Sequence, residues 1–147
     1  MRALPRQLTV DELAELFQAR SRFVEALAGE EDPLGRARDV LASLPEEQRV
    51  EALNAHPRIG ERRLSGPSAT EQGDAAAEGP AVMEELARLN AAYEERFGFR
   101  FVVFVNRRRR AELVPVLRER LGRTREEELA TGCDALVAIA EDRWRSR

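Results

Sequence analysis

Residues 124–145 read TREEELATGCDALVAIAEDRWR, and this stretch decides the fold class. Apolar side chains recur in it every three or four residues, which places them on one face of an α-helix. Thr124, followed three residues later by Glu127, is a capping-box signature for the start of that helix. The stretch therefore predicts a long C-terminal helix, and the residues on or beside its apolar face are Leu129, Cys133, Leu136, Val137, Ala140, Arg143 and Trp144.

The same helical spacing dominates the rest of the chain. Thr9 with Glu12 is a second capping box, and Asp32 followed by Pro33 is a further helix start. Helices are predicted from about residue 10, over 21–28, from 33, from 45 to 54, from 80 to 97, and after 110 as far as 121. A chain of 147 residues has room for one compact domain. We therefore expect a single all-α, multi-helix domain over residues 1–147.

Two segments interrupt the helical pattern. Residues 55–80 are rich in Gly, Pro, Ser and other small residues, and the stretch is too long for an ordinary connection, so it predicts a functional loop. Residues 101–105 read FVVFV, an aromatic and β-branched run that suits an extended chain. No second strand candidate accompanies this run. The prediction is therefore a short extended core segment rather than a sheet.

The composition excludes several classes of function. A net charge of −3 does not favour a polyanion such as nucleic acid as partner, and the absence of lysine excludes Schiff-base and Walker-type chemistry. One cysteine, Cys133, cannot form an internal disulfide, and one histidine, His56, cannot supply a Cys/His zinc cluster. No run of eighteen apolar residues occurs. We expect a cytoplasmic protein with no export signal, membrane span or metal site.

His56 is the first candidate for chemistry, because imidazole exchanges protons near neutral pH. Pro57 restricts the backbone beside it and Gly60 permits a close turn, so the run from His56 to Gly60 is suited to hold the ring over a cavity. A histidine that merely caps the end of a helix is the structural alternative.

A second candidate is the loop stretch with Ser68, Glu71 and Gln72, which offers a hydroxyl, a carboxylate and an amide. Ser-x-x-Glu is also the signature of a capping box, so a purely structural role fits as well. If Glu71 lies near His56, its carboxylate can orient the imidazole, as a catalytic base requires.

Three other features favour structural roles. The run from Arg107 to Arg110 has no interleaved aromatic residues, so a solvated face is favoured over a phosphate patch. Cys133 lies among apolar residues at helical spacing, as a core thiol does. Arg143 is either an ordinary ion-pair residue or a bidentate clamp for a carboxylate or ureido oxygen.

Several fragments in fixed order carry a family resemblance. They are Asn54-Ala55-His56-Pro57-x-x-Gly60, Ser68-x-x-Glu71-Gln72, Asn90-x-x-Tyr93, Phe97-Gly98-Phe99-x-Phe101, Arg120-Leu121 and Ile139-Ala140-x-x-Arg143. In this order the chain resembles the 2-oxo-4-hydroxy-4-carboxy-5-ureidoimidazoline (OHCU) decarboxylases of urate breakdown. The resemblance runs from about Leu8 to Arg143.

The resemblance implies an all-helical, homodimeric, cofactor-independent carboxy-lyase that converts the ureidoimidazoline to (S)-allantoin in purine catabolism. It implies catalytic roles for His56 and Glu71. The substrate-binding residues that it implies are Pro57, Ser68, Gln72, Phe101, Val103, Val105 and Arg143. The chain departs from the family pattern at Arg58 and Ile59 after His-Pro and at Arg100 between two phenylalanines, and the two arginines bear on substrate specificity.

The chemistry agrees with a lack of cofactor, because the ring C=N of the substrate can take the electron pair that departing CO2 leaves. Three alternatives stay open: a decarboxylase of a related ureido or heterocyclic acid, a non-catalytic helical interaction module, and a weak nucleic-acid binder that uses Arg107 to Arg110.

Overall fold

The computed structural model describes residues 7–57 and 80–146. In these ranges the regular structure is entirely α-helical, as the sequence predicts. The helices are α1 (Val10–Phe17), α2 (Arg22–Leu27), α3 (Pro33–Ser43), α4 (Glu46–Asn54), α7 (Pro80–Phe97), α8 (Arg110–Leu121) and α9 (Arg125–Arg145). No described helix combines the length and apolar character that crossing a membrane requires.

Side-chain caps fix where several helices begin. Thr9 and Thr124 each complete the predicted capping box, with Glu12 and Glu127 as the reciprocal partners. The Asp32 carboxylate accepts a hydrogen bond from the Gly35 amide at the start of α3. Such caps supply acceptors for amide groups that have no partner inside the helix. These local signals explain why the predicted starts agree with the observed ones.

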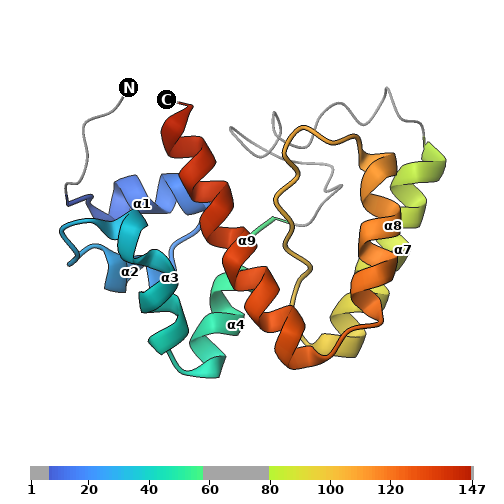
Figure 1. Ribbon diagram of the computed structural model, residues 1–147, viewed down its shortest axis with the longest axis horizontal. Coiled ribbons are helices and arrows are strands. Elements are labelled where there is room, and N and C mark those ends of the chain that lie inside the picture. Colours follow the sequence, from blue (N-terminus) through green and yellow to red (C-terminus); the bar gives the residue numbers. More distant parts are fainter. Residues whose placement is uncertain (1–6, 58–79, 147) are drawn as a thin grey trace.

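Helix α9 is the central element of the fold. In Figure 1 it lies between the group α1–α4 and the pair α7–α8, and it contacts α1, α3 and α4 directly. Gly132 allows the approach of α4, because a Cβ there would lie 3.3 Å from Leu53 Cδ2. Since α4 ends just before His56, this close packing sets the position of the imidazole relative to α9.

The predicted extended segment, residues 101–105, belongs to a non-helical run over residues 98–105, which we call the extended segment, and no strand pairs with it among the described residues. In Figure 1 the segment runs between α9 and the α7–α8 pair. Gly98 begins it at φ +82°, a conformation that glycine adopts without a Cβ penalty. Phe99 and Phe101 are buried and contact the Tyr93 ring edge-on, with centroids 6.1 and 5.2 Å from it. Burial of aromatic side chains, rather than sheet pairing, holds the segment in place.

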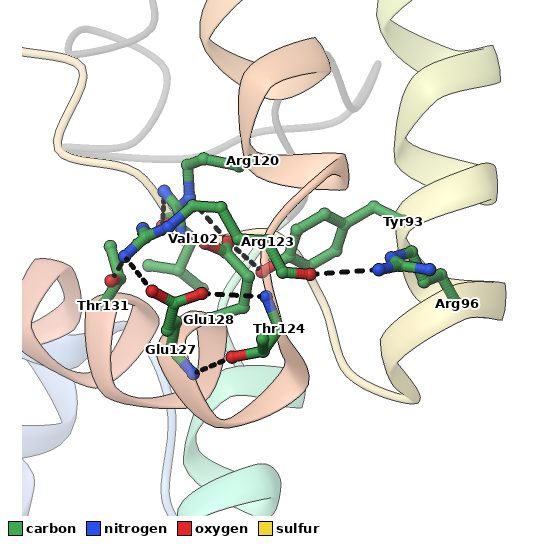
Figure 2. A network of polar contacts seen from close by, with 9 residues as sticks. All are labelled: Tyr93, Arg96, Val102, Arg120, Arg123, Thr124, Glu127, Glu128 and Thr131. Carbon is green, nitrogen blue, oxygen red and sulfur yellow. Dashed lines mark hydrogen bonds and ion pairs between the residues drawn. The ribbon is translucent and has the colours of Figure 1, made fainter.

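A buried network of polar contacts connects this segment to α7, α8 and α9. We call it the Glu128 cluster, and its residues are Tyr93, Val102, Arg120, Arg123 and Glu128. Glu128 Oε1 accepts hydrogen bonds from Tyr93 Oη and Arg120 Nε, both at 2.7 Å, and Oε2 accepts one from Arg123 Nη1 at 3.0 Å (Figure 2). Arg120 Nη1 also donates to the Val102 carbonyl at 3.0 Å. The Glu128 side chain is fully buried, so these partners compensate the cost of removing its charge from water.

Candidate functional site

His56 lies in the turn that follows α4. The backbone amide of His56 donates to the Leu53 carbonyl at 3.1 Å, which tightens the chain after the helix. Its residue is 7% exposed, so the ring is inside the protein, whereas Pro57 is half-buried. A histidine that merely caps a helix would be exposed at its end. Burial therefore favours the chemical interpretation of His56 over the capping one.

The surroundings of His56 favour the neutral imidazole. Burial, together with the nearby positive charges of Arg143 and Arg100, lowers the pKa of His56 from 6.5 to about 3. A cation in a poorly solvated place is costly, especially beside other cations. Nδ1 of the ring is buried and has no hydrogen-bond partner in the described part of the chain. Perturbed titration together with an unpaired polar atom is typical of functional sites.

Arg143 comes to this site from α9, far away in the sequence. It is 5% exposed, and Nη1 donates a hydrogen bond to the Leu16 carbonyl at the end of α1. The residue is therefore not on the surface, and both sequence interpretations, an ion pair and a clamp for a carboxylate or ureido oxygen, stay predictions. Its buried guanidinium retains the fork geometry that suits a carboxylate or ureido oxygen.

Arg100 connects the His56 turn to the extended segment. Its Nη1 donates to the His56 carbonyl at 2.9 Å, and its backbone amide donates to Asn54 Oδ1 at 2.9 Å. Sequence reasoning noted this residue only as a departure from a family pattern. The available signal was a charged residue between two buried phenylalanines, which indicates a side chain that must leave the core for a polar partner.

Arginine side chains donate hydrogen bonds to several backbone carbonyl groups of the extended segment. Arg120 donates to the Val102 carbonyl, and Arg108 donates to the carbonyls of Phe104 and Val105 at 2.7 and 3.0 Å. These bonds replace the partners that a neighbouring strand would supply. The segment can therefore be buried without belonging to a sheet.

The amide groups of the segment differ from its carbonyls. Phe101, Val103 and Val105 are all buried, and no hydrogen bond that we find among the described residues uses their backbone N–H groups. Buried amides are nearly always paired, so the acceptors of these N–H groups are to be sought outside the described part of the chain. The substrate contacts that the resemblance implies for Phe101, Val103 and Val105 stay a prediction.

Three predicted site residues, Ser68, Glu71 and Gln72, lie outside the described residues. Their placement relative to His56 therefore stays a prediction. The described part of the chain brings together His56, Pro57 and Arg143 from the predicted set and adds Arg100.

The arginine run after the segment is not a uniform solvated face, so that expectation was wrong in part. Arg107 and Arg109 are exposed, but Arg108 is half-buried on carbonyl groups and Arg110 is buried at the start of α8. The reason is the turn at Asn106 and Arg107, whose φ values of 50° and 63° redirect the chain into α8. The run therefore closes the extended segment and offers no continuous basic surface.

Cys133 behaves as the sequence predicts for a core thiol. It is half-buried, and burial raises its pKa to about 11. The thiolate, which is the nucleophilic form, is therefore scarce at neutral pH.

The fold and site define an all-helical protein with a buried neutral imidazole near two arginine cations, an arrangement suited to proton transfer on an anionic small molecule. A family model described as OHCU decarboxylase matches residues 2–145. The chain therefore belongs to the OHCU decarboxylase family, as the sequence resemblance indicates.

Two relatives named 2-oxo-4-hydroxy-4-carboxy-5-ureidoimidazoline decarboxylase match part of the chain. The protein of Haloferax volcanii is 33% identical over 104 residues, which cover 69% of this chain and 62% of the relative. The protein of Amia calva is 35% identical over 90 residues, which cover 61% of this chain and 46% of the relative. The match thus spans roughly half to three-fifths of the length of these relatives.

Solved structures extend the similarity to nearly the whole chain. A crystal structure of OHCU decarboxylase in the presence of (S)-allantoin superposes with a TM-score of 0.75 at 28% identity, over 92% of this chain and 96% of that one. A crystal structure of (S)-allantoin synthase gives a TM-score of 0.64 at 21% identity, over 95% of this chain and 54% of that one, and shows the shared fold.

Proposed function

We propose that this protein decarboxylates 2-oxo-4-hydroxy-4-carboxy-5-ureidoimidazoline to (S)-allantoin, as the named relatives do. The observation that carries the proposal is the buried, neutral His56 near the cations of Arg100 and Arg143, with no partner for Nδ1 among residues 7–57 and 80–146. Family membership supplies the substrate class. The site supplies what an acidic substrate with an exchangeable hydroxyl proton requires, namely positive charge and a base.

The reaction breaks the bond between a ring carbon and its carboxylate. CO2 leaves, and its electron pair forms a double bond to the neighbouring ring carbon while the pair of the C=N bond moves to nitrogen, which takes a proton from solvent. The hydroxyl proton then passes to that neighbouring carbon, so that a new C–H bond and a ring carbonyl form. Because the substrate itself accepts the electron pair, the protein has to orient the carboxylate, stabilise charge and move protons. These are tasks for side chains and backbone amides already in place.

His56 is assigned the proton transfers. An imidazole that is neutral at physiological pH begins as a base, so it takes the proton of the substrate hydroxyl first and then returns a proton to carbon as the conjugate acid. Glu71 is assigned to orient the ring, as the sequence resemblance implies. Its carboxylate would stabilise the imidazolium only after the proton has moved.

The binding roles follow from charge and geometry. Arg143 is assigned to the substrate carboxylate or ureido oxygen, and the buried amides of Phe101, Val103 and Val105 are assigned to its other oxygen atoms. Pro57 restricts the turn beside His56, and Ser68 and Gln72 complete the contacts that the resemblance implies.

We further propose a single-domain homodimer in the cytoplasm that uses no cofactor. The dimer follows from the resemblance, and one half-buried cysteine suits a reducing compartment. Sedimentation equilibrium at several concentrations tests the dimer, and a mass of 16.6 kDa throughout would contradict it.

The decisive experiment follows circular dichroism of freshly generated ureidoimidazoline. With the protein present, optically active allantoin is expected to appear much faster than in spontaneous decay. Unchanged decay would contradict the proposal. Activity on a different ureido acid alone would support the proposed site residues but contradict the proposed substrate. No activity on either, with salt-dependent binding of nucleic acid, would favour the basic-surface alternative.

A further inference from the structure

Arg100 makes two hydrogen bonds to the turn that carries His56. Its side chain donates to the His56 carbonyl and its backbone donates to the Asn54 side chain, each at 2.9 Å. One residue of the extended segment is therefore fastened to both sides of the turn that carries the imidazole.

This double link matters because the two parts of the site come from distant elements. The His56 turn follows α4, whereas the amides of residues 101–105 follow α7. A proton transfer requires its partners within about 3 Å, so small shifts between these parts reduce the rate strongly. Arg100 is the residue adjacent to Phe101, where the first of these buried amides occurs.

The charge of Arg100 adds an electrostatic role. Two cations in the described residues act on the imidazole: Arg143 from α9 and Arg100 from the extended segment. Arg100 is half-buried, and only one of its five side-chain N–H donors is used by the His56 carbonyl among the bonds that we find. Its charge is therefore close to the ring without being neutralised by a carboxylate in the described part of the chain.

We propose that Arg100 is a positioning residue of this site, which fastens the His56 turn to the extended segment and holds a fixed cation beside the imidazole. The role deepens the proposed function and rests on His56 as the proton carrier. It also gives a physical meaning to an arginine at this position, because its side chain supplies both the bond to the His56 carbonyl and the charge, whereas the bond to Asn54 comes from the backbone.

The test uses the fact that His56 is the only histidine, so its ring C–H resonances in an NMR spectrum need no assignment. Titrations of wild type, Arg100→Gln, Arg100→Lys and Arg36→Gln are compared from pH 8 down to acid unfolding. Arg36→Gln is the control, because it removes one charge from an exposed side chain on α3. Near-UV circular dichroism confirms that each variant is folded.

Arg100→Gln is expected to move the His56 titration to higher pH than in wild type, because a cation beside the ring is lost. Arg100→Lys should stay near wild type, because the charge is kept, and Arg36→Gln should superimpose on wild type. A titration of folded Arg100→Gln that superimposes on wild type would overturn the electrostatic role.

A second variant tests the link if Arg100→Gln does not fold. Asn54→Ala removes an exposed side chain and leaves the Arg100 charge, so it should speed hydrogen exchange of the Arg100 amide and leave the His56 titration unchanged. Unchanged exchange would overturn the positioning role. Both measurements use protein without substrate. They therefore remain informative if no decarboxylation is found, and an active wild type with a negative result here would leave the proposed function intact.

Discussion

The Glu128 cluster and the His56 site are two buried polar regions with opposite pairing. Both oxygens of Glu128 accept hydrogen bonds, from Tyr93, Arg120 and Arg123. His56 is also buried, but Nδ1 has no partner among the described residues and the charges near it are cations. A buried carboxylate whose oxygens are all hydrogen-bonded contributes to a defined structure, whereas a buried imidazole with a perturbed pKa is typical of a functional site.

The difference separates stability from activity. The Glu128 cluster joins α7, α8, α9 and the carbonyl of Val102, so it holds the extended segment on one side. Arg100 holds the same segment on the other side, at His56. Substitutions in the first region should therefore change unfolding, and substitutions in the second should change turnover.

The largest effect is expected from Glu128→Ala. Breaking a buried ion pair leaves Arg120 as an uncompensated buried charge, which costs about 3–5 kcal/mol of unfolding free energy. Urea unfolding measures the loss. Glu126→Ala, an exposed change in the same first turn of α9, is the control and should stay within about 0.5 kcal/mol of wild type. Equal stability of the two variants would remove the distinction between the regions.

His56→Gln should have the opposite profile. General acid–base catalysis contributes about 10²–10⁴-fold, so turnover should fall by that factor. The change in unfolding free energy at pH 7 should be under about 1.5 kcal/mol, because the two side chains have similar volume and a neutral ring is replaced by a neutral amide. Turnover by circular dichroism and unfolding in urea are measured on the same preparation. Wild-type turnover in this variant would contradict the role of His56.

Tyr93→Phe sharpens the comparison within the Glu128 cluster. It removes the 2.7 Å hydrogen bond to Glu128 and keeps the aromatic ring, so a loss of about 1.5–3 kcal/mol is expected. The pKa of the Tyr93 phenol is raised by burial and by its bond to Glu128, so the hydroxyl is a donor throughout the accessible pH range. Thermal unfolding checks the effect. A loss in the double variant with Glu128→Ala equal to the sum of the single losses would contradict their coupling.

For a change of one pH unit, the smallest effect is a pH dependence of stability from His56. Its folded pKa of about 3 lies below the ordinary 6.5, so the unfolded chain binds the proton first as the pH falls. The stabilising contribution is complete above about pH 6.5 and is lost towards pH 3, by at most about 1.4 kcal/mol per pH unit. The difference between wild type and His56→Gln isolates this part from the carboxylates. Parallel stability curves for the two proteins would contradict it.

Much of the fold could be predicted from the sequence because its signals are local. Thr9, Asp32 and Thr124 mark helix starts through their own side chains, and Gly98 ends α7 by its backbone freedom. The extended character of residues 101–105 was predicted from β-branched and aromatic residues without a second strand. These predictions are confirmed, because the interactions behind them span only a few residues.

The site was predictable in part. His56 and Arg143 were identified by residue type and by resemblance, and the described structure brings them together. Arg100 as a partner of His56 was missed, because its two contacts join residues 44 and 46 positions apart. The expectation that all side chains from Arg107 to Arg110 are solvated was wrong in part, because a tight turn decides which of them face the core.

The sequence by itself determined the helical class, the helix starts, the single histidine and the lack of lysine chemistry, because these depend on composition and short-range spacing. Only the tertiary structure decided that His56 is buried and neutral, that Glu128 is fully paired and that Arg100 links two distant elements. Burial and long-range electrostatics depend on which surfaces meet when α9 packs against α4 and the extended segment, and no local pattern contains that information.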